Sequence, residues 1–310
     1  MIEQISKEIK EVLNSFSSED KIIFNGRTIE LNNGFKGIND KEGEKTVAFV
    51  DGGQTEVIST GNFCLSFIRI FAQVFKGQEK LNSYKKEFYL FTRAKWIEGE
   101  LFYQSKIYGD RAIDEKDLLI SSNDITIKKG VERASVSKVA NIARRFAELS
   151  LGSSIEANFI VLDGTLEKSY RNEEKYLGKL SAGVCALAKS CSLFTVSGNN
   201  PMILLNKLCP PGCWSYFVDN KTSFVKLHPL AKHVFRFEGN LEVLPYLVEN
   251  SRDAVFLGYP YGLMLADRFA RVSNAEKSSL KASFLLRAEN KEIGKYLSSS
   301  NAHDILDNLG

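Results

Sequence analysis

Apolar residues recur along this chain with two different periods. Up to about Ser17 they fall three and four positions apart with charged residues between them, which predicts an amphipathic helix. From Thr46 the pattern changes to short apolar or alternating runs that predict strands over 46–50, 54–60, 63–75, 87–96 and 100–108. The run 63–75 is also long enough for a helix, so its period leaves both structures open.

Helix and strand patterns alternate in the second half of the chain. Helical spacing covers 137–149, 176–189, 241–249, 261–272 and a segment after Asn274. Strand patterns cover 159–162, 192–196, 214–218 and 224–237. An antiparallel-looking run of strands followed by alternating helices and strands predicts a mixed α/β fold rather than a purely doubly wound sheet.

This order also predicts how the chain is divided. A charged region over 109–130 shows no clean period and is predicted to be an inserted arm. We therefore expect an N-terminal helix and polar lead-in over 1–45, a core over 46–273 and a C-terminal helical segment over 274–310.

Composition excludes several classes of protein. The 310 residues are 44% apolar and 25% charged, which excludes disordered, collagen-like and disulfide-scaffold chains. With 41 Lys and Arg against 38 Asp and Glu, the net charge is +3, so nucleic-acid binding would need a local basic surface. Five cysteines, mostly in apolar runs, favour a reducing compartment. With no signal peptide or apolar stretch long enough for a bilayer, the sequence predicts a cytoplasmic protein without a membrane segment.

Two predicted strands end in the dipeptide Asp-Gly. Asp51 follows the apolar run 47–50, and Asp163 follows 159–162. Carboxylates at the ends of adjacent strands share a sheet edge, where they can bind Mg²⁺ or Mn²⁺, which prefer oxygen ligands. Asp-Gly also commonly begins a turn, so this dipeptide leaves both interpretations open.

A third acid lies on the apolar stripe of a predicted helix. Asp267 is four residues after Leu263 and three before Ala270, whereas Arg268 and Arg271 are expected to point elsewhere. A charge on such a stripe is costly unless it is paired or bound to metal. A metal ligand is the favoured interpretation, and a buried salt bridge to an Arg is the alternative.

Glu148 is a fourth candidate, and its spacing argues against it. It falls nearly opposite the apolar stripe of helix 137–149, which favours a surface pair with Arg144 or Arg145. Glu132 is in phase with that stripe only if the helix begins earlier than predicted.

Several short segments resemble the NurA family of archaeal and bacterial nucleases. In the family's order they are FVDGG (49–53), ARRFAE (143–148), IVLDGTL (160–166), AKS (188–190), FVKLHP (224–229), FRFE (235–238) and GYPYGLMLADRFARVS (258–273). The resemblance implies an RNase H-like mixed sheet flanked by helices, a homodimer, and Mn²⁺-dependent DNA cleavage with single-strand endonuclease and 5′-to-3′ exonuclease activity. It also implies a hexameric HerA-type ATPase partner in DNA double-strand break end resection.

The resemblance assigns metal-binding acids residue by residue. It places them at Asp51, Glu148 and Asp163, and some relatives carry His where this chain has Asp267. Secondary candidates are His228 for catalysis and four residues for DNA binding: Lys189, Lys226, Arg236 and Tyr261. For each of the charged residues, a solvated sheet face or a helix-end charge is at least as good an interpretation. Tyr259 and Tyr261 are candidates for stacking on an unpaired base, and a packed aromatic at a helix start is the favoured interpretation of both.

A possible zinc motif is disfavoured. Cys209 and Cys213 precede His228 and His233 with the loose spacing of a Cys₂His₂ site. The two His residues fall in a predicted strand and turn rather than on one helix, and Pro210-Pro211 predicts a rigid loop between the cysteines.

Together these patterns predict a metal-dependent nuclease. Mn²⁺ or Mg²⁺ held by Asp51, Glu148, Asp163 and Asp267 is expected to activate water for phosphodiester hydrolysis. The chain has no P-loop, GxGxxG or Ser-His-Asp order, so energy for translocation would come from a partner. The alternative is a non-catalytic DNA-binding or adaptor subunit of a translocase complex.

Overall fold

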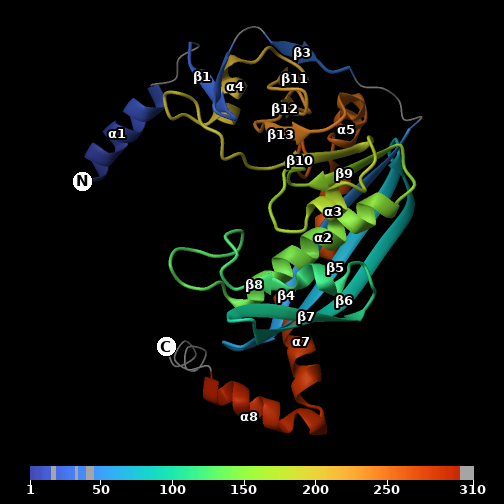
Figure 1. Ribbon diagram of the computed structural model, residues 1–310. Helices are drawn as coiled ribbons and strands as arrows, with labels where there is room; N and C mark the ends of the chain where they lie inside the picture. Colours follow the sequence, from blue (N-terminus) through green and yellow to red (C-terminus); the bar gives the residue numbers. More distant parts are fainter. Residues whose placement is uncertain (15–18, 32–33, 40–44, 301–310) are drawn as a thin grey trace.

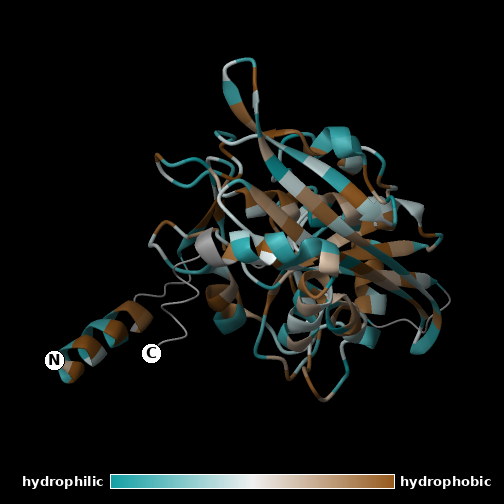
Figure 2. Cartoon of the chain, turned by 90° about the horizontal axis from the view of Figure 1, so that it is seen from below, coloured by the Kyte–Doolittle hydropathy of each residue, from teal (hydrophilic) through white to brown (hydrophobic). Residues whose placement is uncertain are grey.

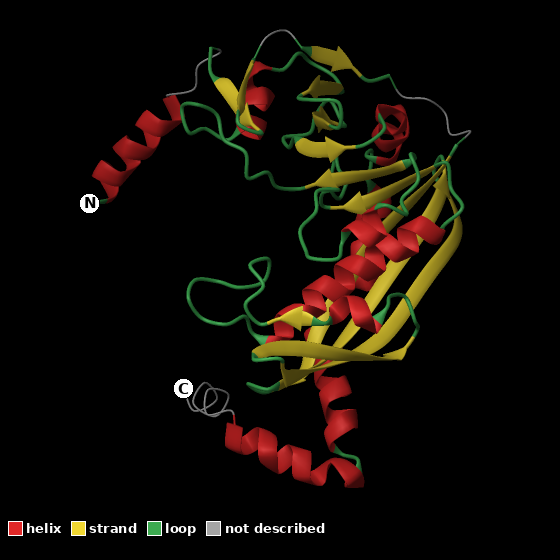
Figure 3. Ribbon diagram, viewed as in Figure 1, coloured by secondary structure: helices red, strands yellow, loops and turns green. Residues whose placement is uncertain are grey.

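One large mixed sheet organises the molecule (Figure 1). The computed structural model describes residues 1–14, 19–31, 34–39 and 45–300. Its main sheet has eleven strands in the order β3-β11-β12-β13-β10-β9-β4-β5-β6-β7-β8, and β1 pairs with β2 in a separate hairpin. Helices lie on both faces of the sheet (Figure 3). The predicted α/β class, an RNase H-like mixed sheet flanked by helices, is confirmed.

The first half of the sheet is an antiparallel meander of long strands. Its strands are β4 (Thr46–Ser59), β5 (Phe63–Lys76), β6 (Glu79–Ile97), β7 (Glu100–Gly109) and β8 (Ile120–Ser121). The ambiguous run 63–75 is strand β5. Its even-numbered residues, such as Ile68 and Ile70, pack on one face, and odd-numbered ones, such as Phe67 and Phe71, on the other. A strand buried on both faces gives a continuous apolar run, which hides its period of two.

The second half of the sheet extends from the other edge of β4. Strands β9 (Phe159–Asp163) and β10 (Val184–Ala188) follow, β9 parallel to β4 and β10 parallel to β9. Antiparallel pairing then adds β13 (Phe235–Glu238), β12 (Thr222–Lys226), β11 (Trp214–Phe217) and β3 (Phe35–Gly37). The separate hairpin consists of β1 (Lys21–Phe24) and β2 (Arg27–Glu30).

Two helical layers enclose separate apolar cores. Helix α2 (Val139–Ser154) lies across the face that carries Ala48 and Val50. Helices α5 (Leu244–Asn250) and α6 (Tyr261–Ala270) cover the face that carries Val47 and Phe49. The remaining helices are α3 (Glu174–Leu177), α4 (Pro201–Leu208), α7 (Asn274–Leu285) and α8 (Lys291–Ser300).

Helix α1 (Ile2–Asn14) confirms the amphipathic prediction for the described part of the N-terminal segment; residues 15–17 of the prediction lie outside the described residues. The helix projects from the body, and its apolar side is visible in Figure 2. No helix in the described ranges combines the length and apolar character that a bilayer crossing requires.

Several local predictions were wrong. The helix predicted over 176–189 is only the short α3 followed by strand β10, and the strand predicted over 192–196 is replaced by a single bridge from Thr195 to Ile22. The Ala- and Leu-containing run 184–188 is buried on both faces between β9 and β13, so sheet pairing outweighs its helical propensity.

The segment 109–130 contacts the sheet. It contains a 3₁₀ turn (Glu115–Leu118) and strand β8, which pairs with β7. Leu118 and Ile120 are fully buried in the core that α2 covers, so this part of the segment packs as an extension of the sheet edge.

Candidate active site at the edge of the sheet

The two Asp-Gly acids lie side by side where strand β9 ends. The parallel pairing of β4 with β9 stops at Val50 opposite Leu162, and the next residues are Asp51 and Asp163. Strand β4 then continues to Ser59 without the turn that Asp-Gly suggested. Within the described chain no strand pairs with this edge of β4 beyond Val50, so both carboxylates stand at an open sheet edge.

Gly52 and Gly53 let two helices approach the same strand from opposite faces. A Cβ on Gly52 would lie 2.5 Å from Glu148 Oε1 of α2, and one on Gly53 would lie 2.1 Å from the carbonyl oxygen of Ala270 in α6. At Gly53 the obstruction is backbone and only glycine fits, whereas a Cβ at Gly52 would displace the side chains of Glu148 and Ile70. The dipeptide therefore positions Glu148 beside Asp51 rather than forming a turn.

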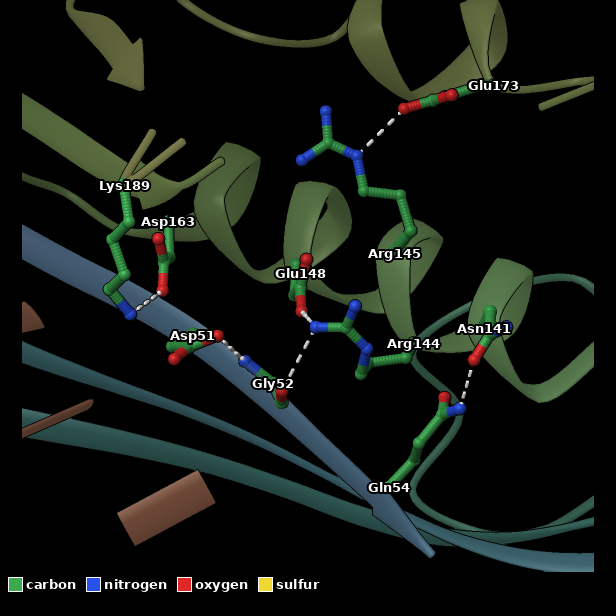
Figure 4. A network of polar contacts seen from close by, with 10 residues as sticks. All are labelled: Asp51, Gly52, Gln54, Asn141, Arg144, Arg145, Glu148, Asp163, Glu173 and Lys189. Carbon is green, nitrogen blue, oxygen red and sulfur yellow. Dashed lines mark hydrogen bonds and ion pairs between the residues drawn. The ribbon is translucent and has the colours of Figure 1, made fainter. Parts of the chain in front are cut away.

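Each carboxylate has a specific donor (Figure 4). The Gly52 amide donates to Asp51 Oδ1 at 2.7 Å, and Lys189 Nζ lies 2.6 Å from Asp163 Oδ2. Arg144 Nη1 lies 2.5 Å from Glu148 Oε1 and donates to the Gly52 carbonyl at 3.1 Å. The Arg144 contacts join α2 to β4, and the separate Lys189–Asp163 pair joins the end of β9 to the residue after β10.

The three acids influence one another electrostatically. Burial, followed by the negative charges of Asp163 and Glu148, raises the pKa of Asp51 to about 7. Burial also raises the pKa of Glu148, against the opposing effects of Arg144 and Arg145. Because the neighbouring cations do not fully offset these charges, the site favours an additional positive charge or a proton.

Tyr259 lies among the same acids. It is buried, and its hydroxyl has no hydrogen-bond partner among the residues that the structure describes. Burial and then the charges of Asp163, Asp51 and Asp267 raise its pKa, and Lys189 Nζ lies 5.1 Å from its ring centroid. The sequence offered Tyr259 as a base-stacking or a packed aromatic residue, because nothing in its spacing reports the neighbouring carboxylates.

Asp267 lies at the border of this group. Its side chain is 36% exposed, and Arg271 Nη2 lies 2.6 Å from its Oδ2. The expectation that Arg271 points elsewhere was wrong, because residues four apart are neighbours on a helix surface. Since the charge of Asp267 reaches Tyr259, α6 contributes a fourth acid near the other three.

A buried ion pair fixes the loop after β9. Arg145 Nε lies 2.8 Å from Glu173 Oε1, and Arg145 Nη2 donates to the Thr165 carbonyl at 2.6 Å. The second oxygen of the fully buried Glu173 accepts the amides of Ser169 and Tyr170 at 2.6 and 2.9 Å. Helix α2 is thus covered by this loop on the side away from the sheet.

The secondary candidates make other contacts. Arg236 is buried with Glu238 at 2.9 Å and with Glu167, and buried Lys226 has its Nζ 4.0 Å from Cys209 Sγ. His228 Nδ1 accepts the Leu230 amide at 3.2 Å. Tyr261 packs against Phe75 and under Lys80. Of the four DNA-binding candidates, Lys189 is the one in direct contact with a predicted metal-binding acid.

The donor chemistry of the acids fits a hard divalent cation. Mg²⁺ and Mn²⁺ prefer carboxylate oxygens, and side-chain cations now take that place on Asp163 and Glu148. Within the described ranges, no three acidic, His or Cys side chains converge closely enough to hold an ion as they stand. Were these acids to hold an ion, it would replace Lys189 and Arg144 as the positive partner of Asp163 and Glu148.

Comparison with known proteins gives a fold relationship. No protein-family model and no curated protein sequence matches the chain. Among solved structures, the NurA nuclease from Sulfolobus solfataricus aligns over 95% of both chains with a TM-score of 0.52 and 12% identity. A second NurA structure aligns over 94% of this chain and 98% of its own, with a TM-score of 0.48 and 9% identity. Endonuclease V of Ciona intestinalis, in complex with an inosine-containing 24mer DNA, covers 75% of this chain and 90% of its own at a TM-score of 0.37 and 11% identity. The chain has the fold of the Sulfolobus solfataricus NurA nuclease.

Proposed function

We propose that this chain is a metal-dependent deoxyribonuclease of the NurA family that hydrolyses phosphodiester bonds. One observation carries the proposal: Asp51, Glu148 and Asp163 lie near one another at the open edge of β4, where burial and mutual repulsion raise the pKa of Asp51 to about 7. Carboxylates that are buried close together despite their mutual repulsion are characteristic of functional sites rather than of stable cores.

The same acids would hold Mn²⁺ or Mg²⁺, with Asp267 nearby on α6. A bound divalent cation would supply activated water and stabilisation of the leaving oxygen. Lys189 and Arg144 now neutralise Asp163 and Glu148, so these cations are placed to bind phosphate oxygens of the substrate when the carboxylates engage an ion.

The wider role follows from the family resemblance. We infer that the chain acts as a homodimer with a hexameric HerA-type ATPase in DNA double-strand break end resection, using single-strand endonuclease and 5′-to-3′ exonuclease activity. A net charge of +3 agrees with DNA supplied by a motor, because the protein alone then needs only weak, salt-sensitive binding.

Cleavage of labelled single-stranded DNA tests this proposal. The wild type is expected to cut with Mn²⁺ and to stop when EDTA removes it. Asp51→Asn and Asp163→Asn are expected to lose about 10³-fold in rate, equivalent to about 4 kcal/mol of transition-state stabilisation. Asp124→Asn is the matched control, because its side-chain oxygen accepts the Thr126 amide in a turn and an Asn preserves that bond.

Two results would overturn the proposal. Equal cleavage by Asp51→Asn and the wild type would show that these acids take no part in the reaction. DNA binding without any cleavage in Mn²⁺, even with the ATPase partner added, would instead establish the adaptor role.

A further inference from the structure

A pocket of about 750 Å³ opens beside the candidate active site. Lys189, Tyr259 and Asp267 belong both to its wall and to the surroundings of the acids. The loops at the carboxyl end of β10, the start of α4 and the segments before β13 and α6 complete it. Its volume falls within the range of about 300–1,000 Å³ typical of small-ligand sites.

The wall combines aromatic, cationic and apolar groups. The rings of His233 and Phe256 are stacked with centroids 5.3 Å apart and an interplanar angle of 15°. Phe256 remains 40% exposed, so part of this aromatic surface is free for a ligand. Lys232 is exposed and has no ion-pair partner among residues 1–14, 19–31, 34–39 and 45–300, while Met202 and Met264 supply an apolar surface.

This combination matches one unpaired nucleotide. A base has two flat apolar faces that stack on aromatic rings, and its phosphates pair with Lys. In a duplex the faces of each base are covered by neighbouring base pairs, so only a frayed or single-stranded nucleotide offers a free face to Phe256. Asp267 belongs to the wall, and Lys189 of the wall is paired with Asp163, so the pocket adjoins the group of acids.

We propose that the pocket binds an unpaired nucleotide of a nucleic-acid strand, with its base against the Phe256–His233 stack and a neighbouring phosphodiester directed to the acids. This assignment rests on the proposed nuclease function and makes it more specific. It predicts a substrate preference for single strands and frayed ends over closed duplex ends.

Fluorescence of an oligonucleotide that contains 2-aminopurine tests the pocket apart from catalysis. The full-length Asp51→Asn protein in EDTA prevents turnover, and stacking on Phe256 is expected to quench the probe. Adding Phe256→Ala is expected to weaken binding roughly tenfold and to abolish the quench, whereas Phe256→Tyr retains both. Lys232→Ala is expected to reduce the slope of log binding affinity against log salt concentration by the amount that corresponds to about one phosphate contact.

Phe217→Ala is the matched control, because Phe217 on β11 is 44% exposed and lies outside the pocket wall. Unlabelled DNA and RNA strands of the same sequence identify the sugar that the pocket accepts: displacement by either supports the proposal, and displacement by neither overturns it.

The two proposals fail in different ways. Tight binding and a full quench in the Phe256→Ala protein would refute the pocket assignment, even if the wild type cuts DNA. A wild type that never cuts, combined with binding that depends on Phe256, would refute the nuclease and leave the nucleotide pocket in place.

Discussion

Asp51→Asn is expected to stabilise the metal-free protein while it removes activity. Asp51 is only 7% exposed, and its ionised form lies near the negative charges of Asp163 and Glu148. Asn has nearly the same shape, and its side-chain oxygen accepts the Gly52 amide as Asp51 Oδ1 does at 2.7 Å. The substitution therefore removes a charge without leaving a cavity or an unpaired donor.

The pKa shift sets the size of this effect. The pKa of Asp51 rises from 3.8 to about 7, a difference of about three units. At about 1.4 kcal/mol per unit, ionised Asp51 lowers the free energy of unfolding by about 4 kcal/mol.

The direction of the shift fixes the pH window. Because the pKa is higher in the folded protein than in the unfolded chain, protonated Asp51 favours the folded state. This contribution is complete below pH 3.8 and is lost as the pH rises to about 7. The stability advantage of Asp51→Asn should thus be near zero at pH 4 and largest above pH 7.

Urea unfolding of both proteins in EDTA, from pH 4 to 8, measures this advantage. Titrating groups that do not interact with Asp51 act equally in the two proteins and cancel in the difference, whereas the repulsion between Asp51 and its neighbours Asp163 and Glu148 is part of the difference being measured. A difference that stays constant across this range, or a wild type that is more stable at pH 8, would refute the argument. Mn²⁺ is expected to narrow the gap at pH 8, because a ligand that binds only the folded wild type stabilises it.

Three further substitutions test the packing around the acids by urea unfolding. Gly53→Ala places a Cβ 2.1 Å from the Ala270 carbonyl oxygen and is expected to lower the free energy of unfolding by about 1–3 kcal/mol. Gly61→Ala is the control, because its Cβ meets open space and should change stability little. Equal effects of the two substitutions would show that α6 does not pack tightly against the strand. Arg145→Met leaves the fully buried Glu173 without its ion-pair partner and should lower the free energy of unfolding by about 3–5 kcal/mol. A decrease of less than about 1 kcal/mol would mean that another group or a proton neutralises Glu173. Tyr259→Phe removes a buried hydroxyl that makes no hydrogen bond of good geometry and should raise the free energy of unfolding by about 1 kcal/mol. A decrease would show that this hydroxyl bonds to the nearby Asp163 carboxylate.

The sequence was sufficient to place the two aspartates but not the glutamate. Asp51 and Asp163 follow short apolar runs that form parallel neighbours, so their meeting at a sheet edge follows from strand pairing. A helical wheel with one buried stripe places Glu148 on the exposed side of α2, and this prediction failed because α2 is buried on two sides. Phe146 stacks on Tyr176 with ring centroids 4.6 Å apart, while Glu148 faces Gly52.

Other features depend on contacts that no local pattern encodes. The run 184–188 reads as helix, and only its position between β9 and β13 makes it a strand. The pocket beside the acids joins segments around Lys189, Met202, His233 and Phe256, which are far apart in the sequence. The chemistry of each of these residues can be read from the sequence, but their proximity can be known only from the fold.

The Gly52–Gly53 dipeptide has a consequence for how this protein tolerates change over evolution. Helices α2 and α6 come from distant parts of the sequence, yet α2 is held at contact distance from Gly52 and α6 from the adjacent Gly53. Insertions and deletions in the intervening loops therefore leave the separation between the helices and the strand unaltered. Relatives with very different loop lengths and little sequence identity can retain the same arrangement of acids, provided that both glycines persist.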